Sequence, residues 1–475
     1  MKTINKYRGS GAAAVFLITA ASLICINSGA LATEYAFITT TDYTTGSSSV
    51  IRLDGSHTAD LDVASVHSDA VSRWYRGLIY VVNRGGADNI QILDPEENFS
   101  TLDQFSVGNG SNPQDIAFVS ETKAYVTRYD SNQLWIVNPS TGAHTGSIDL
   151  SSLADGDGLC EMDKMIITGG ILFVSIQRMD RDNYWLPAGT SYLAAVDCDA
   201  DTLIDTDSSS PGVQPITLSY TNPFSDIQFN RFDGTLLVSS VGSWGINDGG
   251  IEVIDPEALA VTGTMITESS AGGDINDFEI YSPGQGFAIV TNASFNNEVI
   301  SFDPETGQRE NTLYSPGAYV INDIEISPAG ELFLADQTET DPGIRIYRCS
   351  DGSQITSGPV STGLPPFDIC FSMAVQTDSE DPAPAAALGQ NYPNPFNPST
   401  SIDFSISAEG RVKATVYDAA GRRVATLANR IFRAGPHTLR WDGLDSRSRQ
   451  CPSGVYFARV SAGGFTGTVK MVLIR

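Results

Sequence analysis

The stretch Asn322-Asp323-Ile324-Glu325-Ile326 decides the fold, because the chain repeats its pattern about seven times. An Asp followed by alternating, mostly apolar residues recurs at Asp69, Asp115, Asp163, Asp226, Asp277, Asp323 and Asp368. The intervals are 46, 48, 63, 51, 46 and 45 residues. A second landmark trails each copy, an apolar residue followed by a turn former, as in Leu93-Asp94-Pro95 and Phe302-Asp303-Pro304. Periods of this length, filled with short strands, predict a β-propeller.

Each repeat divides into four predicted strands. In the copy that begins at Asp115 they cover 116–119, 124–127, 134–137 and 145–150, separated by turn-forming residues. The first copy lacks an inner strand, and residues 367–371 supply one from the other end of the repeats. A ring closed by both ends leaves no exposed sheet edge, so we predict seven blades, six continuous and one composite.

Composition divides the chain into four parts. Residues 1–32 have a positively charged start, an apolar stretch and the cleavage signal Ala30-Leu31-Ala32, and therefore predict a signal peptide. Residues 33–376 hold the repeats, and 377–390 form a polar, proline-containing linker. Six further predicted strands in 391–475 indicate a small immunoglobulin-like β-sandwich. The predicted fold class is therefore all-β, a seven-bladed β-propeller followed by this sandwich, with no transmembrane segment once the signal is removed.

The net charge of -28 is unevenly distributed. Residues 389–475 contain 12 Lys and Arg against 5 Asp and Glu, whereas residues 33–388 contain 13 against 51. An acidic propeller repels nucleic acid and anionic membranes, which excludes them as partners. The acidic surface either keeps an exported protein soluble or attracts cations.

Five cysteines remain after removal of the signal, so they cannot all pair within the chain. Cys349 and Cys370 are predicted neighbours at the ring closure, and Cys160 and Cys198 lie in one repeat. Export permits disulfides without requiring them.

The second strands carry a family resemblance. Tyr80-Val81-Val82-Asn83, Tyr125-Val126-Thr127-Arg128 and Ile289-Val290-Thr291-Asn292 resemble the Tyr-Val-Thr-Asn (YVTN) repeats of secreted and surface-layer propellers. The resemblance covers roughly residues 35 to 375. It implies a propeller whose role is binding, structural or lactonase-like, so it does not decide the function.

The C-terminal part carries a second resemblance. The opening Asn391-Tyr392-Pro393-Asn394-Pro395-Phe396-Asn397-Pro398 and the later Val416-Tyr417-Asp418-Ala419-Ala420-Gly421-Arg422 resemble the type-A sorting domain of the type IX secretion system. Gly454-Val455-Tyr456-Phe457 and the closing Lys470-Met471-Val472-Leu473-Ile474 match its end. The pattern is also similar to the immunoglobulin-like domain of the flagellar hook-capping protein. The resemblance implies delivery to the cell surface or the medium through the secretion machinery, with the domain then cleaved or retained.

The recurring aspartates are the first candidate site. Inner strands line a propeller's channel, so a ring of Asp is expected near one mouth, where like charges disfavour full ionisation. One interpretation is a bound Ca²⁺ or Mg²⁺, with Glu279 and Glu325 extending the site. In a second, each Asp accepts backbone N–H bonds from the adjacent blade; in a third, Arg84, Arg128 and Arg178 pair with the ring. The metal candidates in the channel are Asp115, Asp163, Asp226, Asp277, Asp323 and Asp368.

A second metal candidate is the acidic turn from Asp197 to Asp207. Its carboxylates Asp197, Asp199, Asp201 and Asp205 have the spacing of a calcium loop. However, Thr202 replaces the glycine of such loops and Ser208 replaces the bidentate Glu. The alternative is an exposed acidic hairpin turn.

The predicted ligand face follows the second strands, where irregular loops interrupt the repeats. It comprises Arg84, Arg128, Arg178, Trp185 and Trp244, because aromatic and Arg side chains on loops are typical binding hot spots. No motif indicates a catalytic nucleophile, and the four histidines have no catalytic spacing. We therefore expect a secreted or outer-surface protein that binds a protein or glycan. The alternatives are a metal-dependent, lactonase-like hydrolase at the channel mouth and a structural surface-layer component.

Overall fold

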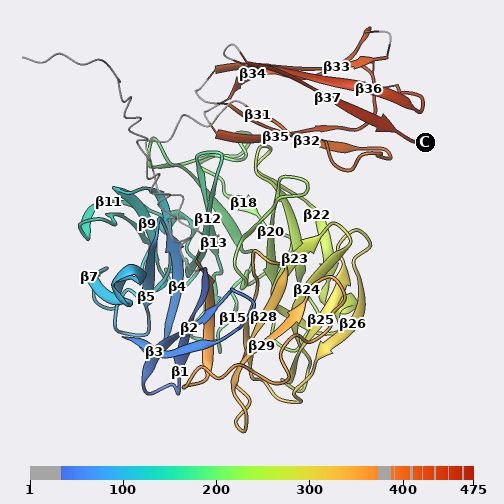
Figure 1. Cartoon of the computed structure of the whole chain (residues 1–475). Helices are drawn as coiled ribbons and strands as arrows, with labels where there is room; N and C mark the ends of the chain where they lie inside the picture. Colours follow the sequence, from blue (N-terminus) through green and yellow to red (C-terminus); the bar gives the residue numbers. More distant parts are fainter. Residues whose placement is uncertain are drawn as a thin grey trace, which may run out of the picture.

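The computed structural model describes residues 34–372, 387–389, 391–406, 410–419, 421–432, 435–447, 449–462 and 465–475. The predicted signal peptide, residues 1–32, and most of the predicted linker lie outside these residues. The described chain is nearly all-β, and the sheets between residues 35 and 371 form the seven blades of a propeller. In Figure 1 the colours run around the propeller from blue to orange, and the orange-red strands of the C-terminus form a separate sandwich.

Neighbouring strands within every blade are antiparallel, and each blade begins with an inner strand. The inner strands are β4 (Ala70–Tyr75), β8 (Pro113–Ser120), β12 (Met162–Thr168), β19 (Gln228–Asn230), β23 (Asp274–Ser282), β27 (Ile321–Ile326) and β30 (Pro366–Phe371). The second strands are β5 (Leu78–Asn83), β9 (Lys123–Arg128), β13 (Ile171–Ile176), β20 (Thr235–Ser240), β24 (Gln285–Thr291), β28 (Glu331–Asp336) and β1 (Tyr35–Thr41).

The outer half of each blade is formed by its third and fourth strands. The third strands are β6 (Asn89–Asp94), β10 (Gln133–Asn138), β16 (Tyr192–Asp197), β21 (Gly250–Asp255), β25 (Asn297–Asp303), β29 (Gly343–Arg348) and β2 (Gly46–Arg52). The fourth strands are β7 (Ser100–Ser106), β11 (Ala143–Asp149), β17 (Thr202–Leu203), β22 (Ala260–Thr267), β26 (Gln308–Tyr314) and β3 (Ala59–Val66).

The blade of β27, β28 and β29 departs from the expected four strands. Its sheet has three, and the following segment makes only isolated bridges, Ile344 with Val360 and Tyr347 with Gln354. Pro359, Pro365 and several Gly and Ser residues in this segment disfavour a regular edge strand. The prediction of four strands per repeat is therefore wrong for this blade.

Ring closure occurs as predicted, between the two ends of the repeats. β1 pairs with β30 in the register Phe37 with Cys370 and Ile38 with Ile369. Ile38 packs with Phe333 of the preceding blade, and Phe37 packs with Ile79 of the following one. The composite blade is therefore tied into the core on both of its faces (Figure 1).

Burial explains why the middle strands read as continuous apolar runs. Five of the six residues of β5 and of β13 are buried, because adjacent blades cover both faces of each sheet. The outer strands behave differently, and in β7 Phe105 is the single buried residue. The apolar content of a strand therefore depends on its place within the blade.

Short additional elements decorate the blades. They are the bridge-length strands β14 (Met179–Asp180), β15 (Leu186–Pro187) and β18 (Ile216–Thr217), the 3-10 turns η1 (Pro95–Glu97) and η2 (Ser151–Leu153), and the helix α1 (Glu268–Ala271). No helix in the described part of the chain is long and apolar enough to cross a membrane.

The C-terminal domain is a sandwich of two sheets. One contains β31 (Ala387–Leu388), β32 (Thr400–Ile406) and β35 (Gly435–Trp441). The other contains β33 (Gly410–Asp418), β34 (Arg423–Phe432), β36 (Gly454–Ala462) and β37 (Phe465–Leu473). Trp441 and Tyr456 stack edge to face between the sheets, at a centroid distance of 4.9 Å. All six strands predicted for this part are present.

The five cysteines after the predicted cleavage point are all free thiols in this structure. Cys160 illustrates the role of the buried ones, since its Sγ donates to the carbonyl of Leu150 at 2.9 Å. The structure therefore contains none of the disulfides that export would permit.

Candidate functional site

The recurring aspartates tie neighbouring blades together at one end of the channel. Four of them accept a hydrogen bond from a backbone N–H within the next inner strand. The pairs are Asp115 with Met165 at 2.9 Å, Asp277 with Ile324 at 3.2 Å, Asp323 with Ile369 at 2.6 Å and Asp368 with Ser72 at 2.8 Å. The blade-linking interpretation is therefore confirmed for these four positions.

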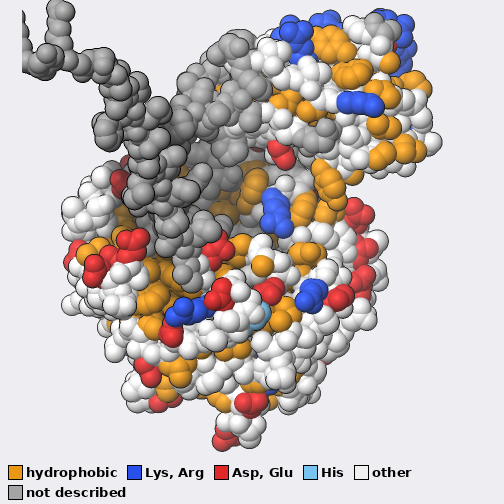
Figure 2. Space-filling view, viewed as in Figure 1, with side chains coloured by type: hydrophobic (Ala, Val, Ile, Leu, Met, Phe, Trp, Pro, Cys, Tyr) orange, Lys and Arg blue, Asp and Glu red, His pale blue; other side chains and the backbone are white. Residues whose placement is uncertain are grey.

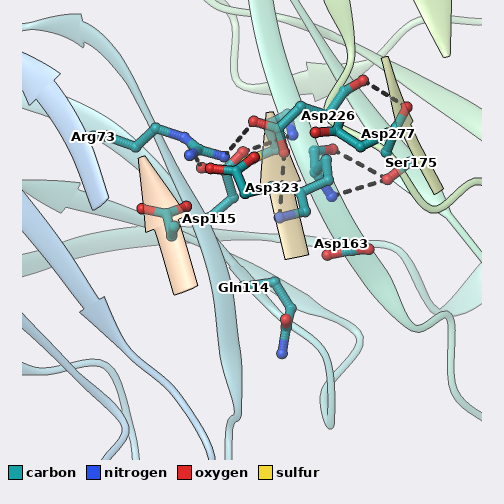
Figure 3. Close-up of polar contacts among 12 residues, drawn as sticks. Arg73, Gln114, Asp115, Asp163, Ser175, Asp226, Asp277 and Asp323 are labelled. Carbon is teal, nitrogen blue, oxygen red and sulfur yellow. Dashed lines mark hydrogen bonds and ion pairs between the residues drawn. The ribbon is translucent and has the colours of Figure 1, made fainter. Parts of the chain in front are cut away.

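Two cations that the sequence analysis missed lie among these carboxylates. Arg73 of β4 donates from Nε to Asp115 and from Nη2 to Asp226, each at 2.9 Å. Lys164 of β12 reaches the other oxygen of Asp226 at 3.2 Å. Figure 3 shows Arg73 extending toward Asp115 and Asp226. The signal was present in the sequence, since a charged residue inside an inner strand must point into the channel or into the core.

These contacts affect the carboxyl groups of the ring unequally, because Asp226 has a lowered pKa whereas burial raises the pKa of Asp115 even beside Arg73. Burial alone would raise the pKa of Asp226, but Arg73 and Lys164 outweigh it and hold that pKa at about 2. On the opposite sector, burial and the charge of Asp226 raise the pKa of Asp277 to about 7. Burial followed by neighbouring carboxylates also raises the pKa of Asp323 well above its usual range. The cations therefore lie on one side of the channel, and the carboxyl groups of Asp277 and Asp323, on the other side, have raised pKa values.

Asp163 and Asp69 differ from the other repeats. Asp163 accepts from Gln177 Nε2 at 2.9 Å through one oxygen, while its other oxygen is buried without a hydrogen bond. Burial raises the pKa of Asp163 to about 6. Asp69 lies outside the ring, which corrects the expected seven members. Ser72, whose N–H donates to Asp368, follows Asp69 by three residues, whereas the corresponding spacing in the other repeats is one or two. Arg84 pairs with Asp69 at 2.8 Å.

The predicted metal sites lack a converging ligand set. Among the described residues, no group of three or more His, Cys, Asp or Glu side chains is arranged to hold a metal ion. In the turn from Asp197, Asp197 Oδ1 accepts from the backbone of Asp199 and Ala200, and Asp205 Oδ1 from that of Asp207 and Gln214. Asp201 instead pairs with Lys123 at 2.7 Å. These residues do not fit a calcium ion as they are arranged.

The five predicted ligand-face residues do lie at one face, because each lies at or beyond the end of a second strand. However, the arginines are used to brace loops. Arg128 donates to the carbonyl of Val107 and lies 4.4 Å over Trp135, and Arg178 donates to the carbonyl of Thr190. Trp185 remains 47% exposed. Trp244 is half-buried edge to face against Phe224, at a centroid distance of 5.2 Å.

This face is richer in aromatic side chains than the sequence analysis recognised. Six exposed aromatics lie in its loops, and we call them the aromatic face: Tyr43, Tyr184, Trp185, Phe224, Phe295 and Tyr319. Arg181, also missed, stacks on both Trp185 and Tyr129 while pairing with Glu161 at 2.8 Å. Arg181 lies in the irregular loop that follows β13, and that irregularity was the available signal.

Comparison with known proteins bears on the two domains separately. Residues 397–464 match the FlgD Ig-like domain family. No curated protein matches this chain. A solved Lactobacillus plantarum protein is 14% identical, covers 72% of this chain and 100% of its own, and has a TM-score of 0.50. That likeness concerns the fold alone.

Two other solved structures are less similar in space. PorZ, an essential bacterial surface component of the type IX secretion system of Porphyromonas gingivalis, is 13% identical with a TM-score of 0.45. The alignment covers 90% of this chain, which spans 63% of the length of PorZ. Apo AztD from Citrobacter koseri is 12% identical over 87% of this chain and 99% of its own, with a TM-score of 0.44. Neither likeness carries an argument about function.

Proposed function

We propose that this protein is an exported propeller that binds a protein or glycan at the cell surface through the aromatic face. The C-terminal sandwich serves its delivery. The proposal is of a binding protein rather than an enzyme, with the ligand held between loops of several blades.

The observation that carries the proposal is the gathering of exposed aromatic side chains on one face. Tyr43, Tyr184 and Phe295 are 67%, 91% and 55% exposed, and they belong to three different blades. Exposing large rings to water costs free energy, so a concentration of them at one face is typical of an interaction site. Tyr and Trp also combine apolar area with a hydrogen-bonding group, and both are enriched at binding hot spots.

The loops that carry these rings are braced in a way that favours binding. Arg181 is held by Asp130 at 2.6 Å and by the fully buried Glu161, and it stacks 4.9 Å from the ring of Trp185. Phe224 likewise supports Trp244. Rings that are already ordered lose less conformational entropy when a ligand binds.

Export is supported by the sequence and by charge. The predicted signal peptide directs the chain out of the cytoplasm, and the sorting-type motifs lie within or beside the part that matches the FlgD Ig-like family. Figure 2 shows Lys and Arg side chains on the C-terminal domain and mainly acidic ones on the propeller. We propose that the basic sandwich is recognised by the secretion machinery and the acidic propeller is the cargo.

The channel favours a binding role over a hydrolytic one. A metal-dependent hydrolase needs carboxylates that converge on one cavity with arginines held away from them. Here Arg73 bonds two of the carboxylates, Asp115 and Asp226. Three others, as well as Asp115 itself, accept hydrogen bonds from backbone N–H groups. This arrangement supports a structural role for that end of the channel.

The test is binding of the full-length chain to glycan and peptide microarrays, compared with the double variant Trp185→Ala/Tyr184→Ala. We expect the variant to lose at least about tenfold in affinity for the ligands that the wild type selects. Phe229→Ala is the matched control, because Phe229 on β19 is also 47% exposed but lies outside the aromatic face. Equal binding by the wild type and the double variant would refute the proposal.

A further inference from the structure

A cavity of about 740 Å³ opens at the end of the channel opposite the aromatic face. It lies where the inner strands end, and the β27–β28 turn from Ser327 to Gly330 forms part of its rim. Its wall combines acidic, aromatic and aliphatic side chains: Glu279, Glu325, Tyr281, Phe371, Ile280 and Ile326. A volume of this size suits a small organic molecule or a peptide side chain.

The two glutamates occupy the same position on neighbouring strands. Glu279 lies two residues after Asp277 on β23, and Glu325 lies two residues after Asp323 on β27. Gln228 donates to Glu279 Oε1 at 2.8 Å. Glu325 is surrounded by protein apart from the cavity, and within the described chain it has no hydrogen-bond or ion-pair partner. Its carboxyl group is thus an acceptor that faces the cavity without a donor.

The cations that line the cavity are already engaged elsewhere. Arg73 is held by Asp115 and Asp226, and Arg231 donates to the carbonyl of Tyr281 at 3.3 Å while stacking on Phe232. The part of the wall that contains Glu279 and Glu325 therefore carries uncompensated acid. A cationic ligand can supply the missing partner, because it stabilises the ionised form of both carboxyl groups.

An organic cation suits this wall better than a metal ion. The described residues provide no group of three metal-ligating side chains, and a bare ion would leave most of the cavity unfilled. A primary ammonium group carries three N–H donors, which two carboxylates can accept. Tyr281 and Phe371 beside them can take an alkyl chain or stack against the cation.

We propose that this cavity binds a primary-ammonium ligand, such as a diamine or a lysine side chain, with Glu279 and Glu325 accepting from the ammonium group. The proposal is independent of the aromatic face, since the two sites lie at opposite ends of the channel.

Binding should be linked to proton release. Burial and neighbouring carboxylates raise the pKa of both Glu279 and Glu325 well above the usual range, which favours their protonated forms when no cation is present. An ammonium group favours their ionised forms, and affinity should therefore increase with pH until the ammonium itself deprotonates. The titratable and charged groups near the two glutamates are Asp226, Asp277, Asp323, Arg73, Arg231, Tyr281, Cys349 and Cys370.

The experiment is isothermal titration of the full-length chain with 1,5-diaminopentane. The same titration with 1,5-pentanediol tests whether the charge is required, since the diol has the same length without ammonium groups. Repeating it between pH 6 and 9, in buffers of different ionisation enthalpy, counts the protons released. The variants are Glu325→Gln and Glu279→Gln, and Glu305→Gln is the control because Glu305 is exposed on a turn away from the cavity.

We expect saturable binding of the diamine, with protons released and affinity rising with pH. Either cavity variant should weaken binding at least about tenfold, whereas Glu305→Gln should not change it. Thermal melting of each variant shows whether it is folded. We expect both cavity variants to fold, because Gln has nearly the same volume as Glu and carries no charge. The proposal is overturned if the diol binds as well as the diamine, or if neither binds at millimolar concentration. It is also overturned if Glu325→Gln folds and binds unchanged, or if Ca²⁺ saturates the site and the diamine does not compete.

Discussion

Replacing Arg73 by Met should destabilise the propeller at neutral pH, because it leaves two carboxylates of the channel without their shared cation. Asp115 is buried, with its side chain 2% exposed, and Asp226 is 38% exposed to the channel. Removing one partner of a buried ion pair typically costs about 3–5 kcal/mol. Lys164 still pairs with Asp226, and the channel partly solvates it, so we expect a loss of about 2–4 kcal/mol.

The loss should depend on pH in a specific direction. The pKa of Asp226 is held at about 2 in the folded protein, below its ordinary value of 3.8. A depressed carboxyl pKa contributes stability that is present above the unfolded pKa and disappears as the pH falls toward the folded one. The difference between wild type and Arg73→Met should therefore be largest near pH 7 and shrink between about pH 5 and pH 2.

The assay is urea unfolding followed by tryptophan fluorescence, in which Trp74, Trp135, Trp185 and Trp244 report on the propeller. Arg52→Met is the control, because Arg52 and Asp60 form an exposed pair, 48% and 56% exposed, whose loss should cost less than about 1 kcal/mol. A loss below about 1 kcal/mol for Arg73→Met, or one that is constant from pH 7 to pH 3, would show that Arg73 is not required to balance the ring.

Three further predictions concern the ring, its closure and the acidic turn. Asp277→Asn should gain stability relative to wild type as the pH rises from about 4 to 8. Burial raises the pKa of Asp277 to about 7, so the wild type loses stability when this carboxyl group ionises. Thermal melts in which the two melting temperatures differ by a constant amount across that pH range would contradict this. Ile38→Ala should cost about 2–5 kcal/mol in urea unfolding, because Ile38 is fully buried on the closing strand, whereas a loss under 1 kcal/mol would mean that β1 is dispensable for closure. Adding Ca²⁺ or a chelator should shift the melting temperature by less than about 2 °C. A larger shift that Asp205→Asn abolishes would show that the acidic turn from Asp197 to Asp207 binds calcium.

The repeat by itself determined the architecture of the propeller. A period of about 46 residues sets one blade per copy, and the apolar runs of β5 and β13 are continuous because both faces of such a sheet are covered. The missing first strand and the surplus last one, residues 367–371, specified the closing pair. These features are local or periodic, so one sequence is enough to recognise them.

Charge balance in the channel, by contrast, was decided only by tertiary structure. Arg84 was expected beside the ring and does pair with Asp69, but Arg73 and Lys164 carry the central contacts. They come from two different blades and meet Asp226 of a third, so no spacing along the chain reveals the group. The same holds for Glu279 and Glu325, whose carboxyl groups lie close together because neighbouring blades repeat one register around a common axis. The sequence determined which residues point inward, and the folded ring determined which of them meet.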